Sequence, residues 1–305
     1  MKTTGIALLI VSAAFVLGAD EPKKEAALVI VDAAGKENKI KDYKILAGTR
    51  RLSWLVPAPK VDPKDKTKPL PPAGPEALEF REDNSTTFAA GIVTLVPLDR
   101  IQAIDYDNDP GQQLVTIKLT STKPDEKIEL KGTTRYRGVN KLVIEADVDK
   151  GDLGVAALKF QGGFKDNSIR GLRFAAPKAG AALEGKTATI TAADKMSTKH
   201  EVVDLQALVR HPDGRLQTLP YLMFKKTLKV DLGKVKSIKF KDDPKTNEAE
   251  AEVALADGET LVLTALRVVP VDDKPTQLEG LVGKVPAGYK LFPLHTIAEL
   301  NLGGN

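Results

Sequence analysis

The segment VDLGKVKSIKF (residues 230–240) carries the pattern that decides the fold. Its apolar residues stand three, three and two positions apart, at Leu232, Val235, Ile238 and Phe240. The same spacing recurs in residues 96–106 and 292–302, and in degraded form in residues 164–174, where Asp166 holds the first apolar position. The residues that correspond to Val235 are Ile101, Ile169 and Ile297, so successive copies lie 68, 66 and 62 residues apart. This near-regular spacing predicts structural repetition.

Alternate copies resemble each other more than neighbouring copies do. Asp109-Pro110 follows the first copy and Asp243-Pro244 follows the third, at the same distance from the last apolar residue. We therefore predict two duplicated halves of two subunits each. The expected subunits are residues 20–110, 111–178, 179–245 and 246–305.

The sequence between the copies predicts β-strands. Val115, Ile117 and Leu119 alternate with polar residues, which buries one face of a strand and exposes the other. Asp257-Gly258 stands between two such runs in residues 251–263, and this pair is typical of a tight hairpin because glycine accepts a positive φ. The expected fold class is all-β.

The last subunit shows the plan most clearly. Two hairpins precede a short turn at His295-Thr296, which leads into a final strand. Five strands with a one-turn kink before the fifth resemble the SH3-like and Sm-like small barrels. The resemblance rests on the apolar spacing and on Pro97-Leu98 and Pro293-Leu294, and it implies tandem five-stranded barrels but no functional residue. Two β-sandwich-like domains are the alternative architecture.

Two segments stand outside the repeats. Residues 1–19 combine Lys2, an apolar run and two small residues, which predicts a cleaved signal peptide and a secreted or periplasmic protein without a later transmembrane segment. Residues 57–75 contain seven prolines, which lack the N–H that a sheet requires, so we expect an extended surface insertion in the first subunit.

Composition excludes several classes of site. The 305 residues include no cysteine, so the chain has no disulfide, thiolate nucleophile, thiolate metal site or lipid-attachment cysteine. A formal charge of +4 does not predict a nucleic-acid partner. His200, His211 and His295 show no metal-ligand spacing. We expect no cofactor.

Two motifs suggest ligands but favour plainer interpretations. GAALEGKT (residues 180–187) matches a phosphate-binding loop, and such a loop needs a helix after it. The residues that follow favour a strand. We therefore interpret the segment as a linker between the halves that binds no nucleotide. Asp105, Asp107 and Asp109 alternate as in some calcium loops, but the glycine and glutamate of a helix–loop–helix site are missing. A repeated turn explains them better than a calcium site.

Eight lysines between Lys225 and Lys245 form the main candidate surface. Lys229, Lys236 and Lys239 are expected on one solvent-exposed face, which could bind an anionic polymer, although lysines also protect edge strands from unwanted pairing.

Three functions follow from the sequence. The first is an exported, non-catalytic β-repeat protein that acts as a binding or scaffold module for an unidentified protein or envelope polymer. The second is a hydrolase whose carboxylates lie in a cleft between the halves. The third is an anionic-polymer binder that uses the lysine face.

Overall fold

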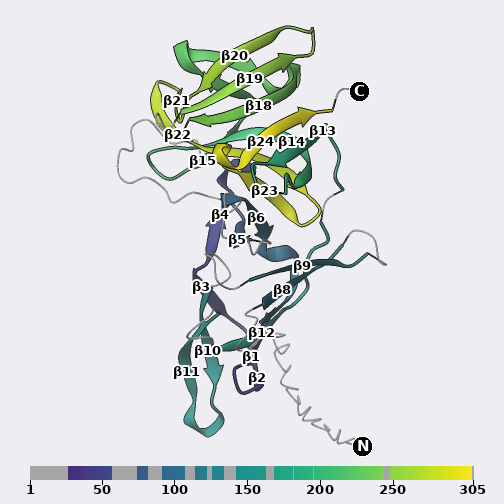
Figure 1. The fold of residues 1–305 in the computed structure, drawn as a ribbon. Coiled ribbons are helices and arrows are strands. Elements are labelled where there is room, and N and C mark those ends of the chain that lie inside the picture. The colour runs from purple at the N-terminus through teal and green to yellow at the C-terminus, as the bar shows by residue number, and fades with distance from the viewer. Residues whose placement is uncertain are drawn as a thin grey trace, which may run out of the picture.

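A computed structural model describes residues 27–56, 74–81, 91–106, 114–121, 126–133, 142–162, 168–180, 182–194, 196–243 and 248–303. The predicted signal peptide, most of the proline-rich insertion, Asp107, Asp109 and Pro244 lie outside these residues. The described chain forms β-strands joined by turns and by 3₁₀ helices of three residues each (Figure 1). This confirms the all-β prediction.

Every strand pair among the described residues is antiparallel, and these strands form three sheets. The six-stranded sheet has the order β2 (Glu37–Ile40), β1 (Leu28–Asp32), β12 (Ile169–Phe174), β7 (Ile101–Tyr106), β8 (Leu114–Leu119), β9 (Ile128–Thr133). The three-stranded sheet has the order β11 (Val155–Gln161), β10 (Val143–Asp149), β3 (Tyr43–Ala47).

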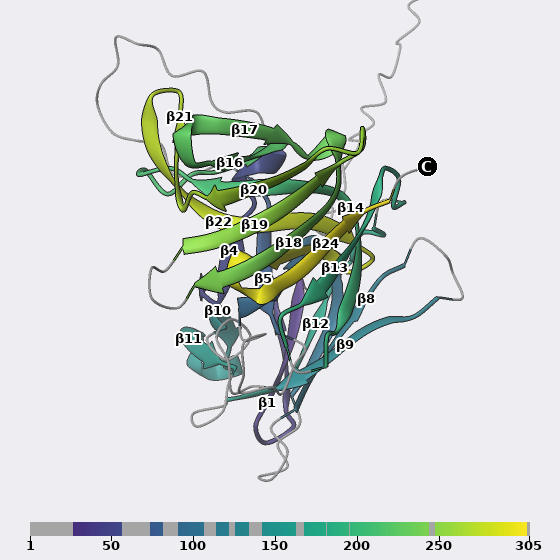
Figure 2. The same cartoon turned by 45° about the horizontal axis from the view of Figure 1, so that its top comes forward.

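The third sheet has fifteen strands and curves through the upper part of the molecule (Figure 2). Its order is β17 (Leu228–Asp231), β16 (Tyr221–Phe224), β20 (Thr260–Ala265), β19 (Glu248–Leu255), β18 (Val235–Asp243), β24 (Ile297–Leu302), β13 (Thr187–Ala192), β14 (Lys199–Arg210), β22 (Lys274–Val285), β23 (Gly288–Phe292), β6 (Val93–Pro97), β5 (Glu76–Phe80), β4 (Thr49–Arg51). In addition, β15 (Leu216–Leu219) pairs with β14, and β21 (Val268–Val271) pairs with β22.

No sheet of the described chain closes into a barrel, so the expected tandem five-stranded barrels are not confirmed. The physical reason is the partner of each last strand. A closed unit needs its last strand to return to its own first strand. Here β12 lies between β1 and β7, which both belong to the predicted first subunit, and β24 lies in the same way between β13 and β18 of the predicted third.

The same strand path occurs in the first half (β1–β12) and in the second half (β13–β24). The first follows β2–β1–β12–β7–β8–β9, and the second follows β14–β13–β24–β18–β19–β20. The third apolar residues of the motif face each other across the central pair of each path, Ile104 opposite Leu172 and Ile238 opposite Leu300. The two halves therefore agree in register as well as in strand order.

The strands β7, β12, β18 and β24 are called the closing strands below, and all four carry an irregularity at the same place. The pairing shifts by one residue directly after Ile101, Ile169, Val235 and Ile297, the second apolar positions of the motif. One extra residue on the closing strand is a β-bulge, which bends the strand locally. Three closing strands also follow a 3₁₀ turn: η3 (Leu98–Arg100), η7 (Leu232–Lys234) and η8 (Leu294–Thr296).

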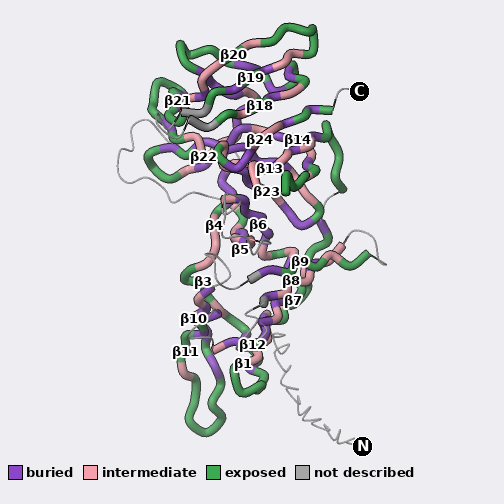
Figure 3. The backbone as a smooth tube through the Cα atoms, viewed as in Figure 1, coloured by how far each residue is buried: buried purple, intermediate pink, exposed green. Residues whose placement is uncertain are grey.

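Burial follows the motif (Figure 3). The second apolar residues, Ile101, Ile169, Val235 and Ile297, are at most 2% exposed. One core lies in each half, and a third core of eight buried residues, including Leu52, Leu95 and Leu291, lies where the halves meet.

Candidate functional site

A hydrolase cleft was expected at the joint between the two halves, and a continuous sheet crosses this joint. Strand β6 of the first half pairs with β23 of the second, with Thr94 opposite Lys290. Gly288 has a positive φ of 143°, and a Cβ atom there would collide with the Leu95 carbonyl oxygen. Only glycine therefore allows the two strands to approach this closely.

A serine fastens the joint a second time. Ser53 lies in η1 (Ser53–Leu55), and its Oγ accepts a hydrogen bond from the Leu216 N–H at 2.8 Å and donates one to the Leu216 carbonyl at 3.1 Å. Both groups are buried, so each hydrogen bond satisfies a polar atom that water does not reach. The first-half segment after β4 is thus fixed to β15 of the second half.

Four charged side chains at the joint bind one another. The Arg50 Nε contacts Glu79 at 2.6 Å, and its Nη1 lies 3.6 Å from Glu279. Arg210 contacts the other oxygen of Glu279 at 2.7 Å, and the Glu279 side chain is only 14% exposed. A guanidinium group thus separates the two carboxylates. This arrangement suits an ion-pair bridge between β4, β5, β14 and β22, whereas a glycosidase needs a carboxylic acid that protonates its substrate.

Aromatic and cationic groups lie beside this network. Trp54 and Tyr289 contact edge to face, with ring centroids 5.8 Å apart. Burial lowers the pKa of the Arg100 guanidinium and raises the pKa of the Tyr289 hydroxyl. Lys284, which faces Tyr289 across the strand pair, forms an ion pair with Asp204 at 2.7 Å. These contacts join η1, β14, β22 and β23, and the contact of Trp54 with Tyr289 was not predicted because the two residues lie far apart in the sequence.

The three predicted lysines are exposed but do not share one strand. Lys229 lies on β17, at the free end of the large sheet, where its Nζ is 5.0 Å from the centre of the Tyr221 ring. Lys236 and Lys239 lie on β18, which is separated from β17 by β16, β20 and β19. Four strand spacings correspond to about 20 Å along a sheet.

Lys239 is also flanked by acidic residues. It stands opposite Glu252 of β19 and opposite Glu299 of β24. Opposite charges on neighbouring strands stabilise a sheet locally. Carboxylates thus flank Lys239 in the β18 part of the lysine face, whereas Lys229 on β17 stands opposite Met223.

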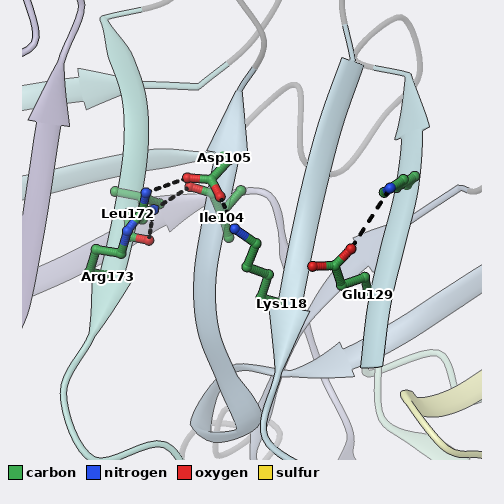
Figure 4. A network of polar contacts seen from close by, with 7 residues as sticks. Ile104, Asp105, Lys118, Glu129, Leu172 and Arg173 are labelled. Carbon is green, nitrogen blue, oxygen red and sulfur yellow. Dashed lines mark hydrogen bonds and ion pairs between the residues drawn. The ribbon is translucent and has the colours of Figure 1, made fainter. Parts of the chain in front are cut away.

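Asp105 occupies the corresponding position in the first half, with the charges reversed. Its two carboxylate oxygens contact Arg173 of β12 and, at 3.0 Å, Lys118 of β8 (Figure 4). Arg173 also donates to the carbonyl oxygens of Ile104 and Leu172. Asp107 and Asp109 lie outside the described residues, and within the described part no three acidic or histidine side chains gather as a metal site. Asp105 itself serves to bridge three strands.

The linker motif GAALEGKT leads into a strand. Thr187 begins β13 directly after Lys186, as the sequence predicted. Lys186 Nζ lies 3.4 Å from the Gly233 carbonyl oxygen. A phosphate-binding loop needs the N–H groups of a following helix, and a β-strand does not present them.

A charged groove lies beside the β10–β11 hairpin. Its volume is about 790 Å³, and it is lined by Lys36, Glu37, Asn38, Lys39, Lys41, Asp42, Asp147, Val148, Asp149, Gly151 and Val155. The hairpin projects from the lower end of the molecule (Figure 1), and at its turn Leu153 is 89% exposed and Val155 69% exposed. Large apolar residues this exposed on a projecting hairpin mark a candidate contact surface. This surface was not predicted from the sequence, although Gly151 and Gly154 are typical of a turn.

A smaller cavity of about 240 Å³ lies in the second half. Its lining includes Arg267, Gln277, Glu279 and His295. Glu279 already belongs to the ion-pair bridge, so this cavity adjoins the joint and offers two exposed side chains, Arg267 and His295.

No family model, curated protein or solved structure matches the chain. Within the described residues, no helix has the length and apolar character to cross a membrane.

Proposed function

We propose that this chain is an exported, non-catalytic β-repeat protein that acts as a binding or scaffold module for a protein or an envelope polymer. The observation that carries the proposal is the joint between the halves. Where a hydrolase would hold a water-filled cleft with two carboxylates, β6 pairs with β23, and Glu79 and Glu279 bind arginines. Glutamates that form ion pairs with arginines at the joint support a rigid, elongated body.

The repeats are proposed to be SH3-like units that have exchanged their last strands. In each half, the last strand of one unit adds to the first strand of the other: β12 to β1, and β7 to β8. The second half repeats this with β24 on β13 and β18 on β19. The exchange of an identical element between two units is a common way to join them. Two exchanged pairs, joined through β6 and β23, support the predicted duplication.

The proposed binding surface is the groove beside the β10–β11 hairpin. Lys36, Lys39 and Lys41 line it together with Asp147 and Asp149, so both signs of charge are available. Val155 adds exposed apolar area. A ligand that carries both charges and short apolar groups, such as a peptide cross-link of an envelope polymer or an extended protein segment, complements this lining.

A second candidate function is the binding of an anionic polymer near β17. Lys225, Lys226 and Lys229 are exposed there, whereas Lys239 stands between two glutamates. This candidate therefore depends on Lys229 and its neighbours and not on the whole face. Its affinity would fall steeply with salt, because the attraction is electrostatic.

Co-sedimentation of the purified chain with isolated cell-wall polymer, at low and at high salt, tests these proposals together. We expect binding that Asp147→Lys weakens, with the polymer left intact. A Lys199→Glu control alters an exposed charge on another strand. Loss of polymer mass that Glu79→Gln or Glu279→Gln abolishes would show the hydrolase instead. Binding that disappears with salt and with Lys229→Glu, but not with Asp147→Lys, would show the anionic-polymer binder.

Export is tested separately. Residues 1–19 are proposed to be removed during secretion, so cell fractionation followed by N-terminal sequencing should find the chain outside the cytoplasm, beginning near Asp20. A full-length cytoplasmic product would contradict the localisation.

A further inference from the structure

Of the four strands that precede the closing motifs, β6 and β23 pair with each other, so the molecule shows how two such strands join. Strands β6 and β23 stand directly before η3 and η8. They pair so that Thr94 faces Lys290, and each of these residues stands four positions before the first residue of its 3₁₀ turn. The contact is therefore symmetric: the same position of two equivalent strands lies at its centre.

Two strands of the same kind keep a free edge. Strand β17, which precedes η7, ends the fifteen-stranded sheet and pairs only with β16 in the described chain. Strand β11 ends the three-stranded sheet and pairs only with β10 among the described residues. Each leaves a row of backbone N–H and C=O groups available to another strand.

The two free edges lie at opposite ends of the molecule. Strand β11 is at the lower end in Figure 1, and β17 lies at the upper end in Figure 2. Exposed apolar residues accompany both: Val155 on β11, and Leu228, 43% exposed, on β17. Leu228 stands four positions before η7, so it occupies the place that Thr94 and Lys290 occupy at the joint.

The edges also differ in charge. The β10–β11 hairpin carries four carboxylates, at Glu145, Asp147, Asp149 and Asp152, against Lys150 and Lys159. Strand β17 and the turn before it carry three lysines, at Lys225, Lys226 and Lys229, against Asp231. Two β17 edges would bring like charges together, whereas a β17 edge on β11 would meet a hairpin whose four carboxylates outnumber its two lysines. The lysines would thus reject one pairing and favour the other.

We infer that the chain assembles head to tail, with strand β11 of one copy pairing with β17 of the next. This contact repeats between molecules the edge pairing that β6 and β23 make within one. Because it joins two different surfaces, it leaves a free edge at each end and generates a filament, or a ring if the rotation closes. The inference rests on the proposed scaffold function and names a second copy of this chain as the partner.

Two charge variants test the contact. Ala157→Lys places a lysine on the β11 edge, opposite Asp147 of its own hairpin, and Lys229→Glu places a carboxylate on the β17 edge. Each variant alone sets like charges against each other, so we expect association to weaken by about tenfold or more. An equimolar mixture restores assembly, because the new lysine then meets the new glutamate and the unchanged edges meet each other.

Sedimentation velocity across about 1 µM to 1 mM, with electron microscopy of the largest species, gives the readout. Ala256→Lys and Lys199→Glu make the same charge changes away from both edges and should assemble as the unmodified chain does. Circular dichroism confirms that every variant is folded. An unmodified chain that stays monomeric throughout, or a Lys229→Glu chain that assembles normally, would overturn the inference. Polymer binding in the co-sedimentation experiment would survive either result, so the two proposals fail separately.

Discussion

Strand β14 and the chain from β2 to β4 occupy matching places in the two halves but are built differently. Strand β14 runs unbroken for twelve residues and pairs with β13, β15 and β22 in one sheet. The first-half chain is interrupted at Lys41-Asp42 and at Gly48, which has a φ of 96°. Its pieces β2, β3 and β4 therefore enter three different sheets. Continuity of this single strand decides whether the strands that pair with it belong to one sheet or to several.

The bulge in β14 explains how this strand bends without a break. Its pairing with β22 shifts between Val203 and Gln206, and Asp204 there has a φ of 53°. Lys284 holds the Asp204 carboxylate. The left-handed conformation is thus supported by a partner on the neighbouring strand, whereas the first half uses Gly48 and loses the ladder.

The shared centre of the two halves should give the largest effects. Leu172→Ala and Leu300→Ala each remove a fully buried side chain from the central strand pair, and we expect each to cost about 3 kcal/mol of unfolding free energy. Urea unfolding measures both. Equal losses of unfolding free energy would confirm that the central strand pairs of the two halves contribute equally to stability. A loss in only one variant would show that the two halves are not equivalent.

The joint should be the next most sensitive place. Gly288→Ala forces a Cβ atom against the Leu95 carbonyl oxygen, so β23 must move away from β6. We expect a cost of about 2 kcal/mol and faster hydrogen exchange in β6 and β23, with little change in β8 and β9. Gly258→Ala is a suitable control, because its positive φ is similarly strained while a Cβ there meets no atom within 4 Å. If both variants behave alike, the joint is not held by close approach.

Two substitutions of Asp204 measure the strain of its left-handed conformation apart from its ion pair with Lys284. Asp204→Gly relieves the left-handed strain and removes the contact with Lys284, whereas Asp204→Ala removes the contact and keeps the strain. The alanine variant should therefore be the less stable of the two by about 1 kcal/mol. Thermal unfolding of the pair decides this, and equal stability would mean that β14 bends for another reason.

Charge reversal at Asp105 and at Lys239, which occupy corresponding positions in the two halves, should change stability least. Asp105→Lys sets a lysine against Arg173 and Lys118, and Lys239→Glu sets a carboxylate against Glu252 and Glu299. We expect each to cost about 0.5–1 kcal/mol by chemical unfolding, since these side chains are partly exposed. The loss of unfolding free energy in each variant should become smaller in high salt. An unchanged unfolding free energy in Lys239→Glu would show that the charges around Lys239 do not contribute to stability.

The closing strands could be predicted from the sequence, but the strands that pair with them could not. The apolar spacing placed Ile101, Ile169, Val235 and Ile297 in the core, and all four are buried there. It also placed strands around Asp257-Gly258 and after Lys186, where β19, β20 and β13 lie. The joint was missed because Ser53, Arg50 and Trp54 meet Leu216, Glu279 and Tyr289 from more than 160 residues away. No local pattern encodes contacts at that separation.

The sequence by itself determined which residues turn inward and where the strands begin, because a period of two and the fixed motif spacing are properties of consecutive residues. Only the tertiary structure decided that β12 inserts between β1 and β7, and that β6 joins β23. Ladder hydrogen bonds connect backbone groups that every residue carries, so any compatible edge can accept a strand. Which edge receives it depends on the packing of the whole chain.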